Sequence, residues 1–281
     1  MTDADAIERR RRSYDEAAAS WGKWAGAQAE QKEQVNRVLL AAAGVGEGHH
    51  VLDLASGVGE PAVTAARLVG ERGRVVATDA SVPMVAVLAE RMASLGLPQV
   101  HCQVADMEAL PFADGAFDAV TCRYGLMYAR DVARTVAEAA RVLKPGGRVA
   151  VLVWGPEEAN PILYHGLRAA NRHWGHPYPE SEFGVAVRLA APDAVAGPMR
   201  AAGLHDIREQ DLVAERRIEV GTPFWAPVLE MNTTEVWRRL SPEQQQATHA
   251  AVAQAYEAFR DGEHYALRSH TRLISAARPL A

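Results

Sequence analysis

The chain has 281 residues, 48% of them hydrophobic, which is enough to bury the core of one large domain or of a core with a small cap. A formal charge of −5 provides no general basic field, so neither nucleic acid nor an anionic membrane is an expected partner. No stretch approaches the roughly 20 apolar residues of a membrane span, and the polar start lacks the apolar segment of a secretory signal, so we expect a cytoplasmic protein without membrane insertion.

The cysteines and the basic run near the N-terminus favour structural roles. Cys102 and Cys122 each lie inside an apolar, strand-like run, which is typical of buried reduced thiols. Neither CxxC nor HExxH spacing occurs, so we expect no metal site. We interpret the run from Arg9 to Arg12 as a solvated helix face rather than as an anion site.

The first half of the chain alternates between helical and strand-like patterns. Residues 4–43 carry apolar positions at helical spacing and predict two or three helices. Between about residues 50 and 154 come five apolar runs, HVLDLAS, GRVVATDA, QVHCQVAD, AFDAVTCR and RVAVLVW, the last after a KPGG turn. The helix that follows the second run has Ser81 or Asp79 near its cap and Pro83 in its first turn. The alternation predicts a parallel doubly wound α/β sheet with ligands at the carboxyl ends of its strands.

The pattern is less regular beyond Trp154. Helices are expected within 156–190 and 222–262, and residues 205–220 and 264–277 read as two long strands that pair antiparallel. We therefore predict a Rossmann-like, mostly parallel, seven-stranded sheet with N-terminal helices and a helical cap. The expected parts are a helical lid over 1–44, a core over 45–155, and a C-terminal part over 156–281 that belongs to the same domain.

The segment VLDLASGVGEPA places a glycine loop directly after the first strand. Such a loop holds a phosphate, a dinucleotide or another adenosine cofactor, and the small Ala62 at the third position excludes none of these. Asp79 ends the second strand twenty residues after Gly59, where a carboxylate accepts both hydroxyls of an adenosine ribose. Asp106, at the end of the third strand, is positioned to accept from the adenine amino group, with Met107 against the ring.

The charge at these strand ends narrows the choice of cofactor. The cleft would repel a negatively charged pyrophosphate, because Asp53, Asp79 and Asp106 all lie at its strand ends. No basic residue stands within the glycine loop to offset their charge. S-adenosylmethionine combines a ribose and an adenine with a positive sulfonium and an α-ammonium group. Gly57 and Gly59 would let the backbone approach its amino-acid end closely. Asp53 is expected to position the loop or the ammonium group.

Four segments in order, DLASGVGEPA, ATDAS, ADMEALPFADGAFDAVTCR and ARVLKPGGRVAV, resemble successive motifs of class I S-adenosylmethionine-dependent methyltransferases. The likeness covers about residues 45–155 and points to the small-molecule branch typified by ubiquinone/menaquinone biosynthesis enzymes. It implies that Ala55, Ala80 and Ser81 also contact the cofactor. The N-terminal YDEAAASW resembles that branch's opening segment, in which an aromatic helix closes over the cofactor, and makes Tyr14 the lid residue; the alternative is a hydrophobic anchor of the first helix.

The acceptor side carries weaker signals. TCRYGLMY stands where relatives often have CRxxxHH, so Met127 and Tyr128 replace a histidine pair. Arg123 is expected to present its backbone carbonyl to the methionine moiety. Any general base would be a His, Glu or Tyr at the cleft mouth. The candidates for catalysis are His165 and His173, eight residues apart on a cap helix, together with Tyr14; the alternative for each histidine is a surface or packing role.

Three functions follow from these patterns. The leading hypothesis is an S-adenosylmethionine-dependent methyltransferase that acts on C or O of a small, partly apolar or aromatic metabolite. The second is a protein that binds S-adenosylmethionine in a non-methylating catalytic or regulatory role. The third, a nicotinamide-dependent oxidoreductase, is disfavoured by Asp53 and by the KPGG pattern. The sequence leaves the oligomeric state open.

Overall fold

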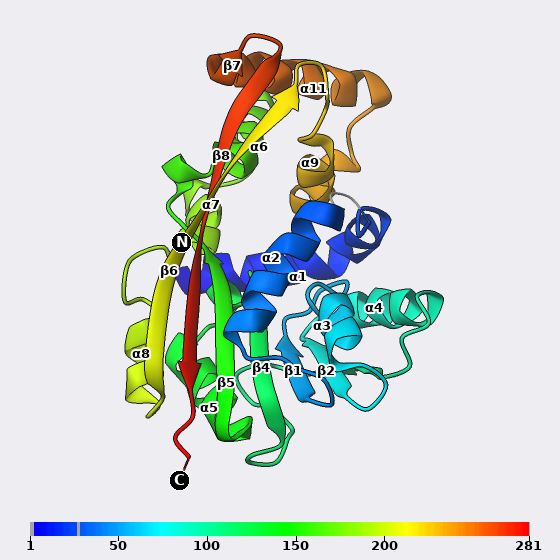
Figure 1. The fold of residues 1–281 in the computed structure, drawn as a ribbon. Coiled ribbons are helices and arrows are strands. Elements are labelled where there is room, and N and C mark those ends of the chain that lie inside the picture. The colour runs from blue at the N-terminus through cyan, green and yellow to red at the C-terminus, as the bar shows by residue number, and fades with distance from the viewer. Residues whose placement is uncertain (1–2, 27–28, 281) are drawn as a thin grey trace.

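The computed structural model describes residues 3–26 and 29–280, and a single mixed sheet organises this part of the chain (Figure 1). Seven strands form its main path in the order β3-β2-β1-β4-β5-β8-β6, and the two-residue β7 pairs with β8 outside that path. The predicted seven-stranded sheet is confirmed. The strands are β1 (His50–Leu54), β2 (Arg74–Asp79), β3 (Val100–Val104), β4 (Phe117–Arg123), β5 (Leu143–Trp154), β6 (His205–Glu219), β7 (Arg260–Asp261) and β8 (His264–Ala277).

Strand direction places the carboxyl ends of the first strands at one edge. β1 runs parallel to both β2 and β4, and the outer pairs β2–β3 and β4–β5 are also parallel. The chain moves outward from β1 in one direction and then returns to its other side, so the loop after β1 lies at a topological switch point. β8 enters antiparallel between β5 and β6, as the sequence pattern predicted.

Helices cover both faces of the sheet. α2 (Ala29–Ala42), α3 (Ala62–Val69) and α4 (Val82–Ser94) pack on one face, where Leu40, Ala66 and Leu88 are fully buried against β1 and β2. α5 (Val132–Val142) and α8 (Ala196–Ala201) pack on the other face, with Val136 and Met199 in its core. Ser81 caps α4 by accepting from the Met84 N–H at 3.2 Å, as predicted.

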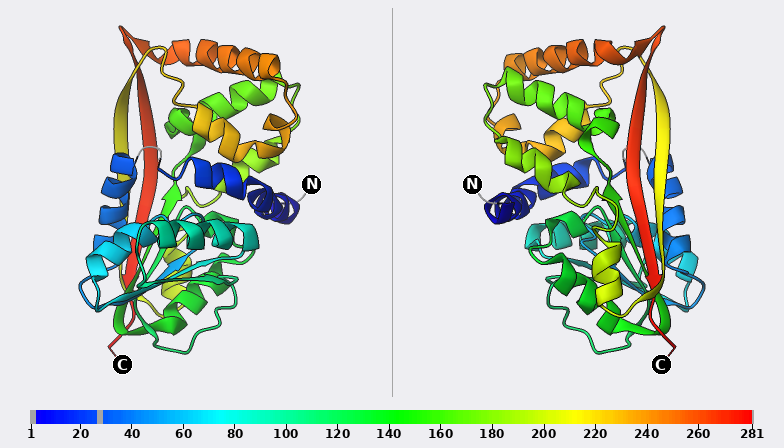
Figure 2. Two further views of the ribbon diagram at one scale, coloured as in Figure 1. Left: turned by 90° about the vertical axis from the view of Figure 1, so that its right-hand side faces the viewer. Right: turned by 90° about the vertical axis from the view of Figure 1, so that its left-hand side faces the viewer.

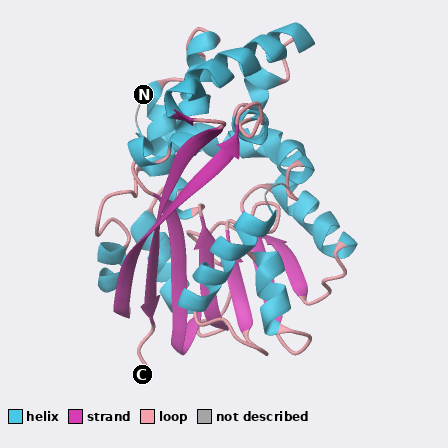
Figure 3. Cartoon of the chain, turned by 45° about the horizontal axis from the view of Figure 1, so that its top comes forward, coloured by secondary structure: helices cyan, strands magenta, loops and turns pink. Residues whose placement is uncertain are grey.

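A helical cap stands over the carboxyl ends of the parallel strands (Figure 2). It consists of α6 (Pro161–His173), α7 (Glu180–Val187), α9 (Ala226–Asn232), α10 (Thr234–Trp237) and α11 (Pro242–Tyr256). The C-terminal end of β6 and the N-terminal end of β8 stay paired with each other and extend beyond β5 into the cap, as Figure 3 shows. Tyr265 and Leu267 of β8 are buried there with Phe224 and Tyr256. The two final strands therefore belong to both the core and the cap.

The two N-terminal helices pack against different parts of the protein. α1 (Asp3–Lys23) lies between the core and the cap and contacts α4, α7, α9 and α10 (Figure 2). α2 instead covers the sheet, because Leu39 and Leu40 are fully buried in its core. The lid expected over residues 1–44 is thus one helix, and the second helix belongs to the core.

Three local expectations differ from the structure. The KPGG segment is part of β5, where the pairing with β4 shifts register between Phe117 and Ala119, rather than a separate turn. Cys122 is buried, but the other free thiol, Cys102, is only partly covered. Arg10 and Arg11 are half-buried and hydrogen-bonded, so the basic run is not a purely solvated face. None of the described helices is both long and apolar enough to span a membrane.

Candidate active site

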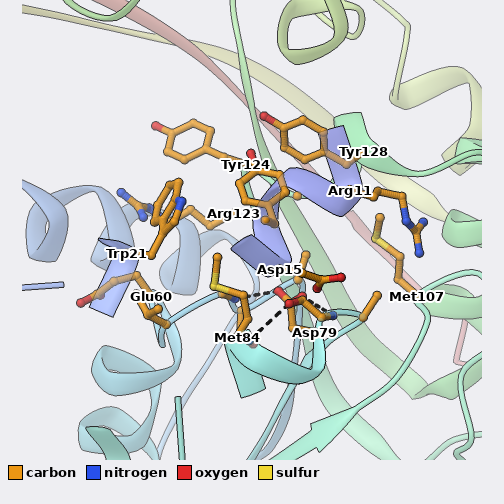
Figure 4. A pocket seen from close by; sticks show the side chains of 18 of the residues that line it. Arg11, Asp15, Trp21, Glu60, Asp79, Met84, Met107, Arg123, Tyr124 and Tyr128 are labelled. Atoms are coloured by element: carbon orange, nitrogen blue, oxygen red, sulfur yellow. Dashed lines mark hydrogen bonds between the residues drawn. The ribbon is translucent and has the colours of Figure 1, made fainter. Parts of the chain in front are cut away.

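A cavity of about 350 Å³ lies at the carboxyl ends of β1, β2 and β4, beneath α1. Figure 4 shows Trp21 and Glu60 on one side of it and Arg11 and Met107 on the other, with Asp79 between them. Nine residues predicted to contact a cofactor line this cavity: Tyr14, Ala55, Gly57, Asp79, Ala80, Ser81, Asp106, Met107 and Arg123. Asp53 and Gly59 do not line it.

Asp79 holds the glycine loop by its carboxylate. Its two oxygens accept from the backbone N–H groups of Gly57 and Ser81, each at 2.9 Å. Gly57 has φ of 52°, in the left-handed region that glycine adopts without strain, and this conformation turns its N–H towards Asp79. Burial raises the pKa of Asp79 above its usual range, although the two hydrogen bonds by themselves would lower it. The carboxylate is therefore fixed in place at the cavity floor.

Asp106 also lines the cavity, and two arginines contact its carboxylate. Its Oδ2 accepts from Arg11 at 3.1 Å and from Arg130 at 3.2 Å, and its Oδ1 accepts from the Glu108 N–H at 3.0 Å. Burial alone would raise the pKa of Asp106, but the Glu108 N–H and Arg11 outweigh it and hold the pKa below its usual range. Arg11 thereby fastens α1 over the loop that follows β3.

Asp53 lies beneath the glycine loop with no exposed surface. Its Oδ1 accepts from the Thr121 hydroxyl at 2.8 Å, and its Oδ2 is buried without a partner among the described residues. Burial raises the pKa of this carboxyl to about 7. The backbone carbonyl of Asp53 accepts from the hydroxyls of Ser56 and Thr78, both at 3.0 Å. Asp53 thus joins the loop to the neighbouring strands.

A second cavity of about 710 Å³ extends from the first into the cap. Its walls are mostly aromatic and aliphatic side chains, including Tyr164, Phe183 and Phe224. The two cavities share one wall, which is formed by Tyr14, Trp21, Lys32, Arg123, Tyr124, Tyr128 and Met231. The two cavities are therefore adjacent at this shared wall.

Aromatic contacts fix the shared wall. Tyr14 meets Tyr128 edge to face, with ring centroids 5.2 Å apart, and Trp21 at 6.0 Å. Tyr124 has φ of 56° and stacks on Trp154 with centroids 4.2 Å apart and ring planes 6° from parallel. Burial raises the pKa of Tyr14 well above its usual range, so its phenol stays protonated at neutral pH.

The histidines proposed for catalysis lie away from both cavities. His165 packs against Tyr256 and Phe259 inside the cap, and its Nε2 is 2.9 Å from the Ala255 carbonyl oxygen. His173 is exposed at the end of α6. Among the residues that line the two cavities, none of those the structure describes is a histidine. The structure therefore brings Tyr14, but neither histidine, to the site.

Sequence reasoning missed much of the shared wall. Lys32 lies outside every motif, whereas Tyr124 and Trp21 stand in TCRYGLMY and YDEAAASW without having been assigned a role there. Among the aromatic residues of the cap, Tyr164 and Tyr178 line the second cavity, while Trp174 donates to Thr248 elsewhere in the cap. No group of three or more His, Cys, Asp or Glu among residues 3–26 and 29–280 is arranged to hold a metal.

The residues of the first cavity fit S-adenosylmethionine. Asp79 offers a fixed carboxylate to ribose hydroxyls, and Met107 offers an apolar surface to adenine. The added Cβ of any other residue at Gly57 would meet no protein atom within 4 Å, so this position is open towards the cavity.

Comparisons with known proteins agree with this geometry. Residues 51–147 match the methyltransferase domain family. The chain is 40% identical over 123 residues to the ubiquinone/menaquinone biosynthesis C-methyltransferase UbiE of Pseudoalteromonas translucida, which is 43% of this chain and 49% of that protein. The chain thus spans about half the length of the curated relatives it matches.

Solved structures share the fold over most of the chain. The YcgJ protein of Bacillus subtilis gives a TM-score of 0.58 at 21% identity, covering 87% of this chain and 97% of that one. An S-adenosylmethionine-dependent methyltransferase from Aquifex aeolicus gives 0.51 at 18% identity, covering 92% and 97%. The chain therefore shares the fold of these structures, and its residues 51–147 match a methyltransferase domain and resemble the UbiE enzymes.

Proposed function

We propose that the protein transfers the methyl group of S-adenosylmethionine to a partly apolar organic molecule bound in the cap. The observation that carries this proposal is the wall shared by two cavities, one at the strand ends and one in the cap. The first holds fixed carboxylates at strand ends, and the second is mostly aromatic and aliphatic. A methyl donor and an apolar acceptor would meet at that wall.

In this proposal the cofactor is held mainly by carboxylates and the glycine loop. Asp79 accepts the ribose hydroxyls while it keeps the loop in place through the Gly57 N–H. Asp106 accepts from the adenine amino group, with Met107 against the ring, and Arg11 and Arg130 orient its carboxylate. Ala55, Ala80 and Ser81 allow close approach because their side chains are small, and they line the same cavity.

Two residues that the sequence predicted to bind the cofactor, Gly59 and Asp53, would not contact it. Gly59 faces α4 rather than the cavity, since an added Cβ there would lie 2.7 Å from the Met92 Cε. Asp53 would support the loop from below, through its carbonyl bonds to Ser56 and Thr78. Both residues would therefore shape the loop without touching the cofactor.

The protein's part in catalysis would be orientation and exclusion of water. S-adenosylmethionine supplies, when bound, an electrophilic methyl group on a positively charged sulfur. The rings of Tyr14, Tyr124 and Tyr128 would border the transfer point and keep water from it, which can supply much of the acceleration of an in-line displacement. Tyr14, protonated because of its burial, would act as a hydrogen-bond donor rather than as a base.

The acceptor class follows from the cap cavity. Its volume of about 710 Å³ falls within the range of pockets for drug-sized ligands. Tyr164, Phe183, Phe224 and Leu167 favour a molecule with an aromatic or aliphatic body. We therefore place the acceptor among organic metabolites that are larger and more apolar than an amino acid, methylated at C or O.

Two measurements test this function. Calorimetry with S-adenosylhomocysteine and with NAD should give binding of the first only, and tight binding of NAD alone would refute the proposal. Incubation with S-adenosylmethionine labelled in the methyl group and a metabolite extract should place label in an apolar small molecule. Persistent absence of label across many extracts would favour a non-methylating role.

A substitution tests the ribose assignment. Asp79→Ala should weaken binding of S-adenosylhomocysteine by about 1–3 kcal/mol, because charged hydrogen bonds to the ribose and the anchor of Gly57 are lost together. Asp118→Ala, at the start of β4 beside Lys144 and outside the cavity lining, should leave the affinity unchanged and serves as the matched control. An unchanged affinity of the Asp79 variant would contradict the assignment.

A further inference from the structure

Two buried polar atoms of the cap lack a hydrogen-bond partner. They are the hydroxyl oxygen of Tyr164 and Oε1 of Glu182, and neither is hydrogen-bonded to any of the described residues. Tyr164 is 4% exposed, and the side chain of Glu182 is 8% exposed. Because buried polar groups nearly always have a hydrogen-bond partner, these two atoms indicate a partner from outside the chain.

The contact between α6 and α7 brings these two residues to the same part of the cap. Arg168 lies one helical turn after Tyr164, on the same face of α6. Arg168 donates to Glu180 at 2.5 Å, and its guanidinium carbon lies 4.6 Å from the ring centroid of Phe183. It thus contacts residues before and after Glu182 on α7. Tyr164 and Glu182 both line the cap cavity of about 710 Å³.

Tyr256 shows how the cap satisfies a buried hydroxyl elsewhere. This tyrosine has no exposed surface and lies outside the cavity lining. Its hydroxyl accepts from the Gly166 N–H at 3.1 Å and donates to the Pro161 carbonyl oxygen at 3.2 Å. The hydroxyl that packs against protein is therefore paired, whereas the hydroxyl of Tyr164, which borders the cavity, is not.

Nearby basic groups act on the carboxyl of Glu182 without donating to its Oε1. The Arg9 Nε forms an ion pair with this oxygen at 3.0 Å, but the geometry is not that of a hydrogen bond. Burial raises the pKa of Glu182, whereas the charges of Arg9 and Arg10 by themselves would lower it. Arg10 also lines the cavity and is held there by Asn232, whose Oδ1 accepts from it at 2.7 Å. The acceptor capacity of Oε1 thus stays open on the side of the cavity.

The two unpaired atoms lie beside the wall shared by the two cavities. Burial raises the pKa of Tyr164 well above its usual range, and the neighbouring phenol of Tyr128 raises it further. Val185, one turn after Glu182 on α7, belongs to a buried cluster against which Tyr128 packs. Because Tyr128 is part of the shared wall, a group held by Tyr164 and Glu182 would lie next to the transfer point.

A single hydroxyl group would satisfy both atoms. A hydroxyl donates one hydrogen bond and accepts others, which matches a carboxylate oxygen on one side and a phenol O–H on the other. We propose that Tyr164 and Glu182 bind a hydroxyl group of the acceptor, which donates to Glu182 Oε1 and accepts from the Tyr164 hydroxyl. The inference rests on the proposed function and adds to its apolar acceptor a polar group beside the transfer point.

The subsite would select and orient the acceptor. An apolar molecule without the hydroxyl would bury Tyr164 and Glu182 away from water with no partner, which costs the desolvation of both groups. A molecule with the hydroxyl would take over the hydrogen bonds that water makes in the empty cavity. The two hydrogen bonds would also fix which edge of the acceptor faces the shared wall, so Tyr164 and Glu182 would act as positioning residues.

The test compares ligands that differ by the hydroxyl alone. Equilibrium dialysis measures binding of naphthol and naphthalene, and of menthol and menthane, in the presence of S-adenosylhomocysteine. A cavity without a polar subsite prefers the hydrocarbon of each pair, because a hydroxyl loses its hydration there. The wild-type protein should instead prefer the hydroxyl compound of at least one pair by roughly tenfold or more, as expected for a hydrogen bond to a charged group.

Variants assign this preference to the two residues. Tyr164→Phe and Glu182→Met should each reduce it severalfold, and the double variant should prefer the hydrocarbon. Glu182→Gln keeps an acceptor oxygen and should retain part of the preference, and it carries the test if Glu182→Met does not fold, as judged by circular dichroism. Tyr256→Phe removes a paired hydroxyl outside the cavity and should leave the preference unchanged.

Urea unfolding gives a second readout that needs no ligand. Tyr164→Phe should leave the unfolding midpoint unchanged or raise it, because the hydroxyl that is lost has no partner in the protein. Tyr256→Phe should lower the midpoint, because the Gly166 N–H loses its acceptor. A structural role of the Tyr164 hydroxyl would make the two variants behave alike.

Three results would overturn the subsite. The first is a wild-type protein that prefers both hydrocarbons or binds none of the four compounds. The second is an unchanged preference in the double variant, and the third is a midpoint that falls as far in Tyr164→Phe as in Tyr256→Phe. None of them depends on cofactor binding, whereas failure of the wild-type protein to bind S-adenosylhomocysteine in calorimetry would refute the proposed function itself.

Discussion

The buried carboxyl of Asp53 makes the pH dependence of folding a quantitative test of the structure. Asp53 has no exposed surface, one hydrogen bond from Thr121 and one oxygen without a partner among the described residues. Burial raises its pKa from 3.8 to about 7. The folded protein therefore holds a proton that the unfolded chain has already released at mildly acidic pH.

The sign and size of the effect follow from proton linkage. Because the folded state binds more protons than the unfolded state between the two pKa values, this group lowers the free energy of unfolding as the pH rises through that interval. Each pH unit in the interval costs about 1.4 kcal/mol. Between about pH 5 and pH 8, where some two units of the interval lie, the loss is about 3 kcal/mol.

Asp53→Asn removes this titration. Urea unfolding of wild-type and variant protein at about pH 5 and pH 8, without cofactor, should show the variant gaining about 3 kcal/mol relative to wild type at the higher pH. Asp118→Asn is the matched control. The Lys144 ammonium outweighs the effect of burial on Asp118 and keeps its pKa below the usual range, so its difference from wild type should be the same at both pH values. Equal differences for Asp53→Asn at both pH values would refute the buried, protonated carboxyl.

The remaining predictions concern the glycine loop and the segment after β4. Gly59→Ala should lower the free energy of unfolding by about 2–4 kcal/mol, because φ is 112° and the new Cβ would lie 2.7 Å from the Met92 Cε. Gly57→Ala should cost only about 1 kcal/mol in urea unfolding but weaken S-adenosylhomocysteine binding in calorimetry by roughly tenfold or more, since its open side faces the cavity; a larger loss of stability than in Gly59→Ala would contradict this. Met127→Ala should cost about 2–5 kcal/mol, because Met127 is fully buried, and a smaller cost would argue against its core position. Tyr128→Phe should change stability by less than about 1.5 kcal/mol and alter acceptor binding instead, and unchanged acceptor binding would argue against a place in the shared wall.

The core of the fold could be read from the sequence because its signals are local. Five apolar runs with helices between them predict parallel strands, and Ser81 and Pro83 mark the start of α4 before any tertiary contact is known. The long strands β6 and β8 were also visible as continuous patterns. What these patterns lacked was the path of the strands out of the sheet, because burial of Tyr265 and Leu267 depends on helices of the cap.

The sequence predicted acidic residues at the strand ends, but it did not show which of them reach the cavity. Asp53, Asp79 and Asp106 all stand at or near strand ends, yet only the last two line the cavity. Asp53 is instead buried within β1, before the glycine loop begins, and accepts from the Thr121 hydroxyl on the neighbouring strand. Similarly, the basic run near the N-terminus looked solvated because its partners, Asp106 and Asn232, are remote in sequence.

By itself the sequence determined the succession of strands along the chain, the glycine loop and the acidic residues at the strand ends. It did so because parallel strands bring their carboxyl ends to one edge whatever the rest of the chain does. Only the tertiary structure decided which side chains form the wall shared by the two cavities. That wall joins Tyr14 to Tyr128, and Arg11 reaches Asp106 across 95 residues. Periodicity records the neighbours of a residue along the chain, whereas this wall consists of contacts between elements that only folding brings together.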